Sequence, residues 1–153
     1  MKEISHLLRK AYLDLLTPFT ISGVTIPIFD TIVNPNTPIP TYSGVKAYIV
    51  ILDQNEVERI GNRCAQSQLA TITLDIVTKF NSGGVFSSLP CEFISDQIQQ
   101  AVNTLTGQPI SINQPDIQVL TTRKSLSRNF TELGSSLTVV RKRIIFEHNI
   151  YES

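Results

Sequence analysis

The stretch LATITLDIVTKF, from Leu69 to Phe80, alternates between apolar and polar side chains. Ile72, Leu74 and Ile76 fall on one face of an extended chain, because successive side chains of a strand point to opposite sides. The other face carries the polar side chains Thr71, Thr73, Asp75 and Lys79. The stretch therefore predicts a strand with one apolar face and one polar face.

A second strand signal, VKAYIVIL, runs from Val45 to Leu52. Its apolar run predicts that both faces are covered, by a helix on one side and by a neighbouring subunit or another element on the other. The two strands are expected to pair antiparallel. The polar segment between them, Asp53–Gln68, predicts a long arm that projects from the body and either contacts a partner subunit or moves as a loop. Its charged side chains include Glu56, Glu58, Arg59 and Arg63.

Two amphipathic helices are predicted from the spacing of apolar side chains. The first runs from Lys2 to Leu16 and ends before Pro18, with its apolar stripe toward the core. The second runs from Ser88, which is expected to cap it, to Thr106. Further strand signals occupy Ile21–Asp30, Ile117–Leu126 and Leu137–Ile150, and loops with prolines occupy Asn34–Ser43 and Gln108–Pro115.

The order of these elements is α-β-β-β-α-β-β. Strands outnumber helices and do not alternate regularly with them, which favours an α+β fold. We expect a mostly antiparallel sheet with both helices packed on one face, formed by a single domain that spans residues 1–153.

The charge composition disfavours several classes of function. The 153 residues include 13 basic and 13 acidic side chains, so the formal net charge is zero. A neutral chain gives little long-range attraction for nucleic acid or an anionic membrane, and it associates with other protein more readily. No apolar run approaches the ~18 residues of a membrane span, and no signal peptide is recognisable. We therefore expect a protein that is made in the cytoplasm and has no membrane partner.

No catalytic or ligand-binding signature stands out. His6 and His148 have no carboxylate or cysteine at ligand spacing on their own side, and both are expected at a surface or an interface. Cys64 and Cys91 lack a CxxC spacing and are expected to be free thiols. Gly83-Gly84 lacks the lysine of a phosphate-binding loop. We expect no enzymatic activity, no metal, no cofactor and no small-molecule substrate.

Basic side chains gather on the last two strand signals, at Arg123, Lys124, Arg128 and the run Arg141-Lys142-Arg143. Arg141 and Arg143 share one side of a strand, where they can form a strip with Arg123 or Arg128. This strip has two interpretations. It is either a solvated sheet face, or a binding surface whose partner is an acidic protein surface or nucleic acid. The absence of interleaved aromatic residues disfavours stacking on single-stranded bases.

Taken in order, these elements resemble a known family over roughly residues 4 to 105. The amino-terminal helix is followed by the segment VTIPIFD, a proline-rich loop, the strand that contains YIVI, and the strand TITLDIVTKF with a helix after it. This succession resembles the tail terminator, or tail-completion, proteins of tailed bacteriophages.

The resemblance implies a structural protein of the virion. Such proteins form a ring, commonly a hexamer, in the neck between the head connector and the tail, and DNA passes through the ring without sequence-specific binding. The implied partners are further copies of the chain and the adjacent connector (portal-side) and tail proteins. The arm residues Glu56, Glu58, Arg59 and Arg63 and the strip residues Arg123, Arg141 and Arg143 are the expected interface. The alternative is a small nucleic-acid-binding module that uses the basic strand pair.

Overall fold

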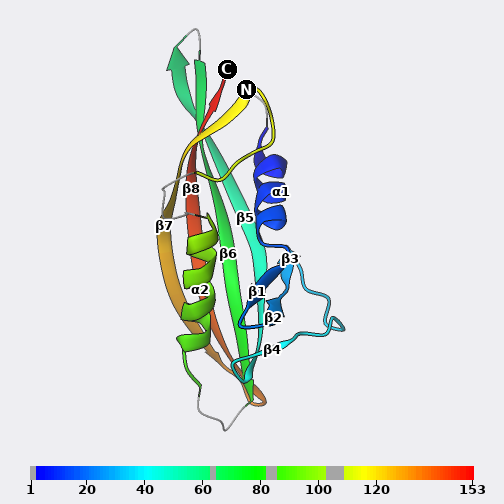
Figure 1. The fold of residues 1–153 in the computed structure, drawn as a ribbon. Coiled ribbons are helices and arrows are strands. Elements are labelled where there is room, and N and C mark those ends of the chain that lie inside the picture. Colours follow the sequence, from blue (N-terminus) through cyan, green and yellow to red (C-terminus); the bar gives the residue numbers. More distant parts are fainter. Residues whose placement is uncertain (1–2, 63–64, 82–85, 103–108) are drawn as a thin grey trace.

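The computed structural model describes residues 3–62, 65–81, 86–102 and 109–153. Long strands run along most of an elongated molecule, and both chain ends lie near one end of it (Figure 1). The described residues form, in order, α1 (Ser5–Leu15), β1 (Phe19–Ile21), β2 (Val24–Ile26), β3 (Ile28–Asp30), β4 (Thr41–Tyr42), β5 (Val45–Asn62), β6 (Ala65–Asn81), α2 (Leu89–Val102), β7 (Ile117–Leu133) and β8 (Leu137–Glu152).

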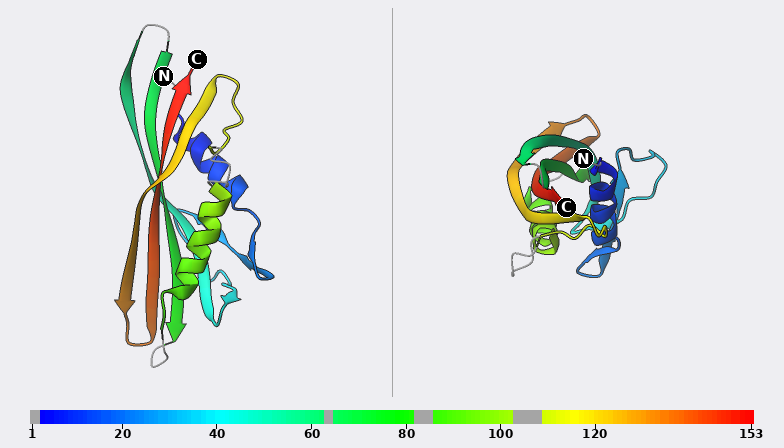
Figure 2. Two further views of the ribbon diagram at one scale, coloured as in Figure 1. Left: turned by 60° about the vertical axis from the view of Figure 1, so that its left-hand side comes forward. Right: turned by 90° about the horizontal axis from the view of Figure 1, so that it is seen from above.

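The main sheet has the strand order β3-β5-β6-β8-β7, and the short β4 also pairs with β5. The pairs β5–β6, β6–β8 and β7–β8 are antiparallel, whereas β3 runs parallel to β5. The sheet twists strongly along its strands, and both helices lie on the same side of it (Figure 2). The predicted α+β fold, a mostly antiparallel sheet with two helices, is confirmed.

The main core lies between the helices and one face of the sheet, which we call the helix face. Ile72, Leu74 and Ile76 are fully buried there, as their alternation predicts. Helix α1 contributes Leu8 and Tyr12, both with no exposed surface. Helix α2 adds Cys91, Ile94, Ile98 and Val102 to the same cluster. Packing on β6 thus places both helices over the centre of the sheet.

The other side of the sheet, which we call the opposite face, is partly covered as well. Tyr48, Val50 and Val77 form a second buried cluster there. Val33 and, from the proline-rich loop that follows it, Ile39 pack against this cluster. The prediction that β5 is covered on both faces is therefore confirmed in its first half, and the cover is an element of the same chain.

Several element boundaries differ from the sequence-based expectations. The tract Ile21–Asp30 is divided among three short strands, because Pro27 separates β2, in a small hairpin with β1, from β3 at the edge of the main sheet. Helix α2 begins after Ser88, whose carbonyl accepts the first helical hydrogen bond, from the Glu92 amide at 3.0 Å, and the Ser87 Oγ accepts a further one from the Leu89 amide at 3.1 Å. Residues 103–106, where this helix was expected to end, lie outside the described residues.

The predicted arm Asp53–Gln68 is wrong as a loop, because it is the distal half of the β5–β6 hairpin. The two strands stay in register from Gln54, opposite Ile72, to Arg59, opposite Ser67. On its far side β6 pairs with β8 as far as Gln66. A row of polar side chains hides this structure from sequence analysis, because cross-strand hydrogen bonds, and not apolar burial, extend these strands.

Candidate functional site: strand edges and the arginine strip

The predicted interface residues of the hairpin lie on different faces. Glu56 is opposite Ala70 and Glu58 is opposite Gln68, so both point to the helix face. Arg59 points to the opposite face. The Glu56 carboxylate accepts a hydrogen bond from the Ser5 hydroxyl on α1. Glu58 and Arg59 are exposed, and Arg63 lies outside the described residues.

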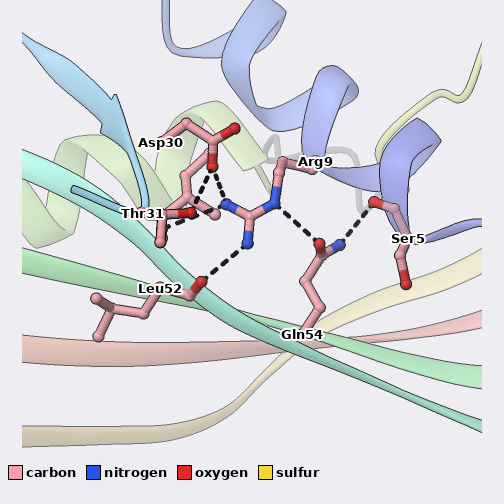
Figure 3. A network of polar contacts seen from close by, with 7 residues as sticks. Ser5, Arg9, Asp30, Thr31, Leu52 and Gln54 are labelled. Carbon is pink, nitrogen blue, oxygen red and sulfur yellow. Dashed lines mark hydrogen bonds and ion pairs between the residues drawn. The ribbon is translucent and has the colours of Figure 1, made fainter.

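Arg9 of α1 fixes the point at which the distal part of β5 begins (Figure 3). A register shift lies between Ile51 and Gln54, and Arg9 binds the backbone there: its Nη2 donates to the Leu52 carbonyl at 2.8 Å. Its Nε donates to Gln54 Oε1 at 3.0 Å, and its guanidinium pairs with Asp30. Gln54 Nε2 in turn donates to the Ser5 carbonyl at 2.8 Å. The helix therefore orients the distal hairpin.

We expect Arg9→Ala to lower the free energy of unfolding by about 2 to 3 kcal/mol, because it leaves carbonyls at the register shift and Asp30 without their charged donor. Lys10→Ala is the matched control, since the Lys10 side chain is 72% exposed and its ion-pair partner is the similarly exposed Asp14 of the same helix. That variant should lose less than about 0.5 kcal/mol. Urea denaturation measures both, and equal losses would contradict this role of Arg9.

The arginine strip is assembled on the opposite face, as the alternation predicts. In the register of β7 and β8, Arg128 lies opposite Arg143 and Arg123 lies opposite Glu147. Arg141 is two residues from Arg143 on the same strand and shares its side. Lys142 points to the helix face and pairs with Glu92 of α2. Arg123, Arg128, Arg141 and Arg143 are the members of the strip from here on.

Carboxylates of the same chain neutralise most of the strip. Arg123 Nε donates to Glu147 Oε1 at 2.7 Å. Arg141 lies 3.3 Å from Asp75 Oδ2 and 3.6 Å from Glu132 Oε1, and Arg143 lies 3.9 Å from Asp75 Oδ2 (Arg–carboxylate N···O distances). Four arginines thus face three carboxylates. Such a surface has a weak positive field, which gives little grip on phosphate.

Asp75 lies at the centre of the strip and was not predicted as a site residue. Its side chain is only 1% exposed. Burial raises the pKa of Asp75, and the charges of Arg141 and Arg143 oppose this shift. Phe130 supports the strip from β7, with its ring centre 4.9 Å from the Arg128 guanidinium carbon and 5.2 Å from that of Arg143. The sequence contains no local signal for this group, because it depends on the register of three strands.

His148 is buried, so the prediction of a surface or interface position is wrong. Its side chain lies on the helix face, 0% exposed, with Nδ1 3.0 Å from the Ala70 carbonyl and Nε2 2.8 Å from the Tyr12 hydroxyl. Because a carbonyl can only accept, Nδ1 carries the proton and Tyr12 donates to Nε2. His6, by contrast, is exposed as expected.

The one cysteine among the described residues is a buried free thiol. Cys91 Sγ lies 3.3 Å from both Thr78 Oγ1 and the Val140 carbonyl. Burial raises the pKa of Cys91 to about 11, which keeps it protonated and unreactive at neutral pH. Cys64 lies outside the described residues.

Within the described ranges, no group of three or more His, Cys, Asp or Glu side chains is arranged to hold a metal ion. In the same part of the chain, no helix is both long enough and apolar enough to cross a bilayer.

Two strand edges remain unpaired among the described residues, and sequence analysis did not single them out. β7 pairs only with β8, so its outer edge has no strand partner from Ile117 to Leu133. β5 is covered by β3 as far as Ile51 and has no second strand partner beyond it. Large apolar side chains on or beside these edges are exposed: Val57, Leu120, Leu126, Leu133 and Leu137. Edges of this kind are sites for pairing with another chain.

Neither a protein-family model nor a curated protein matches this sequence.

Proposed function

We propose that this chain is the subunit of a ring in the neck of a tailed bacteriophage, where it ends the tail or connector and joins the head to the tail. Its role is structural and not catalytic. It is made in the host cytoplasm and becomes part of the virion. Its partners are further copies of itself, most often six in a ring, together with the adjacent connector and tail proteins.

One observation carries this proposal: the two unpaired edges are different surfaces, which lie toward the two ends of the strand order in one sheet. A ring needs a head-to-tail contact between two unlike patches, which closes when the rotation between neighbours divides a full turn. The outer edge of β7 and the distal edge of β5 supply such patches. The α+β fold and the succession of elements that resembles tail terminators point in the same direction.

The state of the arginine strip supports passage of DNA without binding. Three of its four arginines, Arg123, Arg141 and Arg143, are paired with Glu147, Asp75 or Glu132 of the same chain. Each phosphate that a protein neutralises adds to a salt-dependent affinity, and a surface that is already neutralised adds little. A duplex can therefore slide past such a subunit without being held.

Imaging of the purified protein tests the ring. Negative-stain electron microscopy and mass photometry across a concentration series should show closed rings with a central opening and a mass of about six chains. Particles that remain single chains at the highest concentration, even when they are cross-linked, would contradict the proposal. So would open filaments, because they need a contact that does not close.

The rival function is a small nucleic-acid-binding module, and the common face of the four strip arginines favours it. An electrophoretic mobility shift titration with duplex DNA separates the two. The ring proposal predicts weak binding of the isolated protein, with little dependence on salt. Submicromolar binding that falls steeply with salt, and that is lost in the Arg128→Ala and Arg143→Ala variants, would favour the rival.

A further inference from the structure

The free part of β5 and the first half of β7, which is its upper half in Figure 1, lie at the same end of the sheet. The registers connect them in rows across four strands: Asn55 lies opposite Thr71, which lies opposite Glu147, which lies opposite Arg123. In the same way Gln54, Ile72, Phe146 and Lys124 form one row. Below these rows the edge of β5 is already occupied by β3. In these rows, neither the distal edge of β5 nor the outer edge of β7 pairs with another strand among the described residues.

The directions of the two strands suit each other. Three antiparallel pairs separate β5 from β7, so the two edge strands run in opposite directions. A rotation about an axis along the strands leaves their directions unchanged. A closed ring also has no rise along its axis, so neighbouring copies stay at the same level. β7 of one copy therefore meets β5 of the next antiparallel and row against row.

The charged side chains on the two edges are also complementary. The helix face of distal β5 carries Glu56 and Glu58, and that of β7 carries Lys124. In a row-by-row pairing Lys124 lies beside Gln54 of the next copy and diagonal to Glu56, a distance that a lysine side chain spans. The contact would also cover Val57 and Leu120, which are 51% and 45% exposed.

We infer that neighbouring copies of this chain join by antiparallel pairing of the upper half of β7 with the distal half of β5, so that one sheet continues around the ring and Lys124 faces Glu56 of the next copy. This inference rests on the proposed ring and names its contact. Backbone groups of the two edges form the hydrogen bonds of this contact, and the charges of Lys124 and Glu56 select its register.

A charge exchange tests the contact. Lys124→Glu should weaken self-association by about tenfold per contact, because an attractive diagonal pair becomes repulsive. The combination Lys124→Glu with Glu56→Lys should restore it to within about threefold of the original chain. Lys10→Glu makes the same charge change at an exposed position on α1, where Lys10 pairs with Asp14, and should have no effect. Urea denaturation confirms that each variant is folded.

A disulfide tests the geometry without relying on charge. Asn55 and Arg123 share a row but are separated by three strand spacings, roughly 14 Å, too far for a disulfide within one chain. In a background with Cys64→Ser, the variant Asn55→Cys with Arg123→Cys should give a ladder of covalent oligomers under mild oxidation. Each single cysteine variant should stop at dimers.

The outcomes separate this inference from the proposed function. If the original chain forms rings, yet Lys124→Glu leaves them intact and the double cysteine variant gives no ladder, the contact is wrong and the ring stands. If Lys124→Glu increases self-association, the edge charges serve to keep chains apart and the inference is overturned. If the original chain forms no rings and the double cysteine variant gives no ladder, both fail.

Discussion

Acidification from pH 7 to pH 5 is expected to lower the free energy of unfolding by about 2 kcal/mol through His148 alone. Burial, the largest cause, lowers the pKa of His148 from 6.5 to about 4. The unfolded chain takes up a proton on this residue below pH 6.5, whereas the folded chain stays neutral until about pH 4. The stability that His148 contributes is therefore complete above pH 6.5 and falls as the pH drops, with a total loss of about 3 kcal/mol.

Urea denaturation at a series of pH values measures this effect, and two variants identify its source. His148→Gln should be less stable at pH 7 but should lose much of the dependence between pH 7 and pH 5. His6→Gln removes an exposed histidine and should leave that dependence unchanged. If the two variants and the original chain show the same loss on acidification, the role given to His148 is wrong.

Phe146→Ala is expected to have the largest effect on stability, a loss of about 3 to 5 kcal/mol. Phe146 has no exposed surface and lies on the helix face of β8, in the same row as Ile72. Its ring centre is 5.9 Å from that of Tyr12 on α1. Truncation leaves a cavity between the helix and the sheet, where long paired strands cannot easily collapse onto it.

Thermal or urea denaturation checks the value, with two controls. Phe146→Leu keeps most of the volume and should cost less than about 1.5 kcal/mol. Phe93→Ala removes a phenyl ring that is 54% exposed on α2 and should change stability by about 0.5 kcal/mol or less. A loss at Phe93 as large as that at Phe146 would contradict the assignment of the core to the inner side of the helices.

Alternation was the most reliable guide to this fold. It places Ile72, Leu74 and Ile76 in the core, and the parity of β8 puts Arg141 and Arg143 on the other face, as observed. The same parity contained the correct answer for His148, which alternates in phase with Phe146. The polarity of the imidazole favours a surface position, whereas the alternation along β8 places His148 in the core.

Other features depend on contacts that a local pattern does not encode. The distal half of β5 is polar, yet its backbone pairs with β6, so β5 is longer than apolar alternation indicates. The parallel pairing of β3 with β5 joins segments separated by a long proline-rich loop. Burial of Asp75 requires arginines from β8 to reach it across the sheet. In each case the register of distant strands decides the environment.

The proposal of a phage neck protein is tested most directly by genetics, in a phage whose genome carries this gene. With a nonsense mutation in its gene, a nonpermissive host should accumulate filled heads and separate tails, seen by electron microscopy of the lysate. Addition of the purified protein should then restore joined, infectious particles, whereas the Lys124→Glu variant should not. A mutant lysate with normally joined particles, or virions that lack this protein, would contradict the central claim.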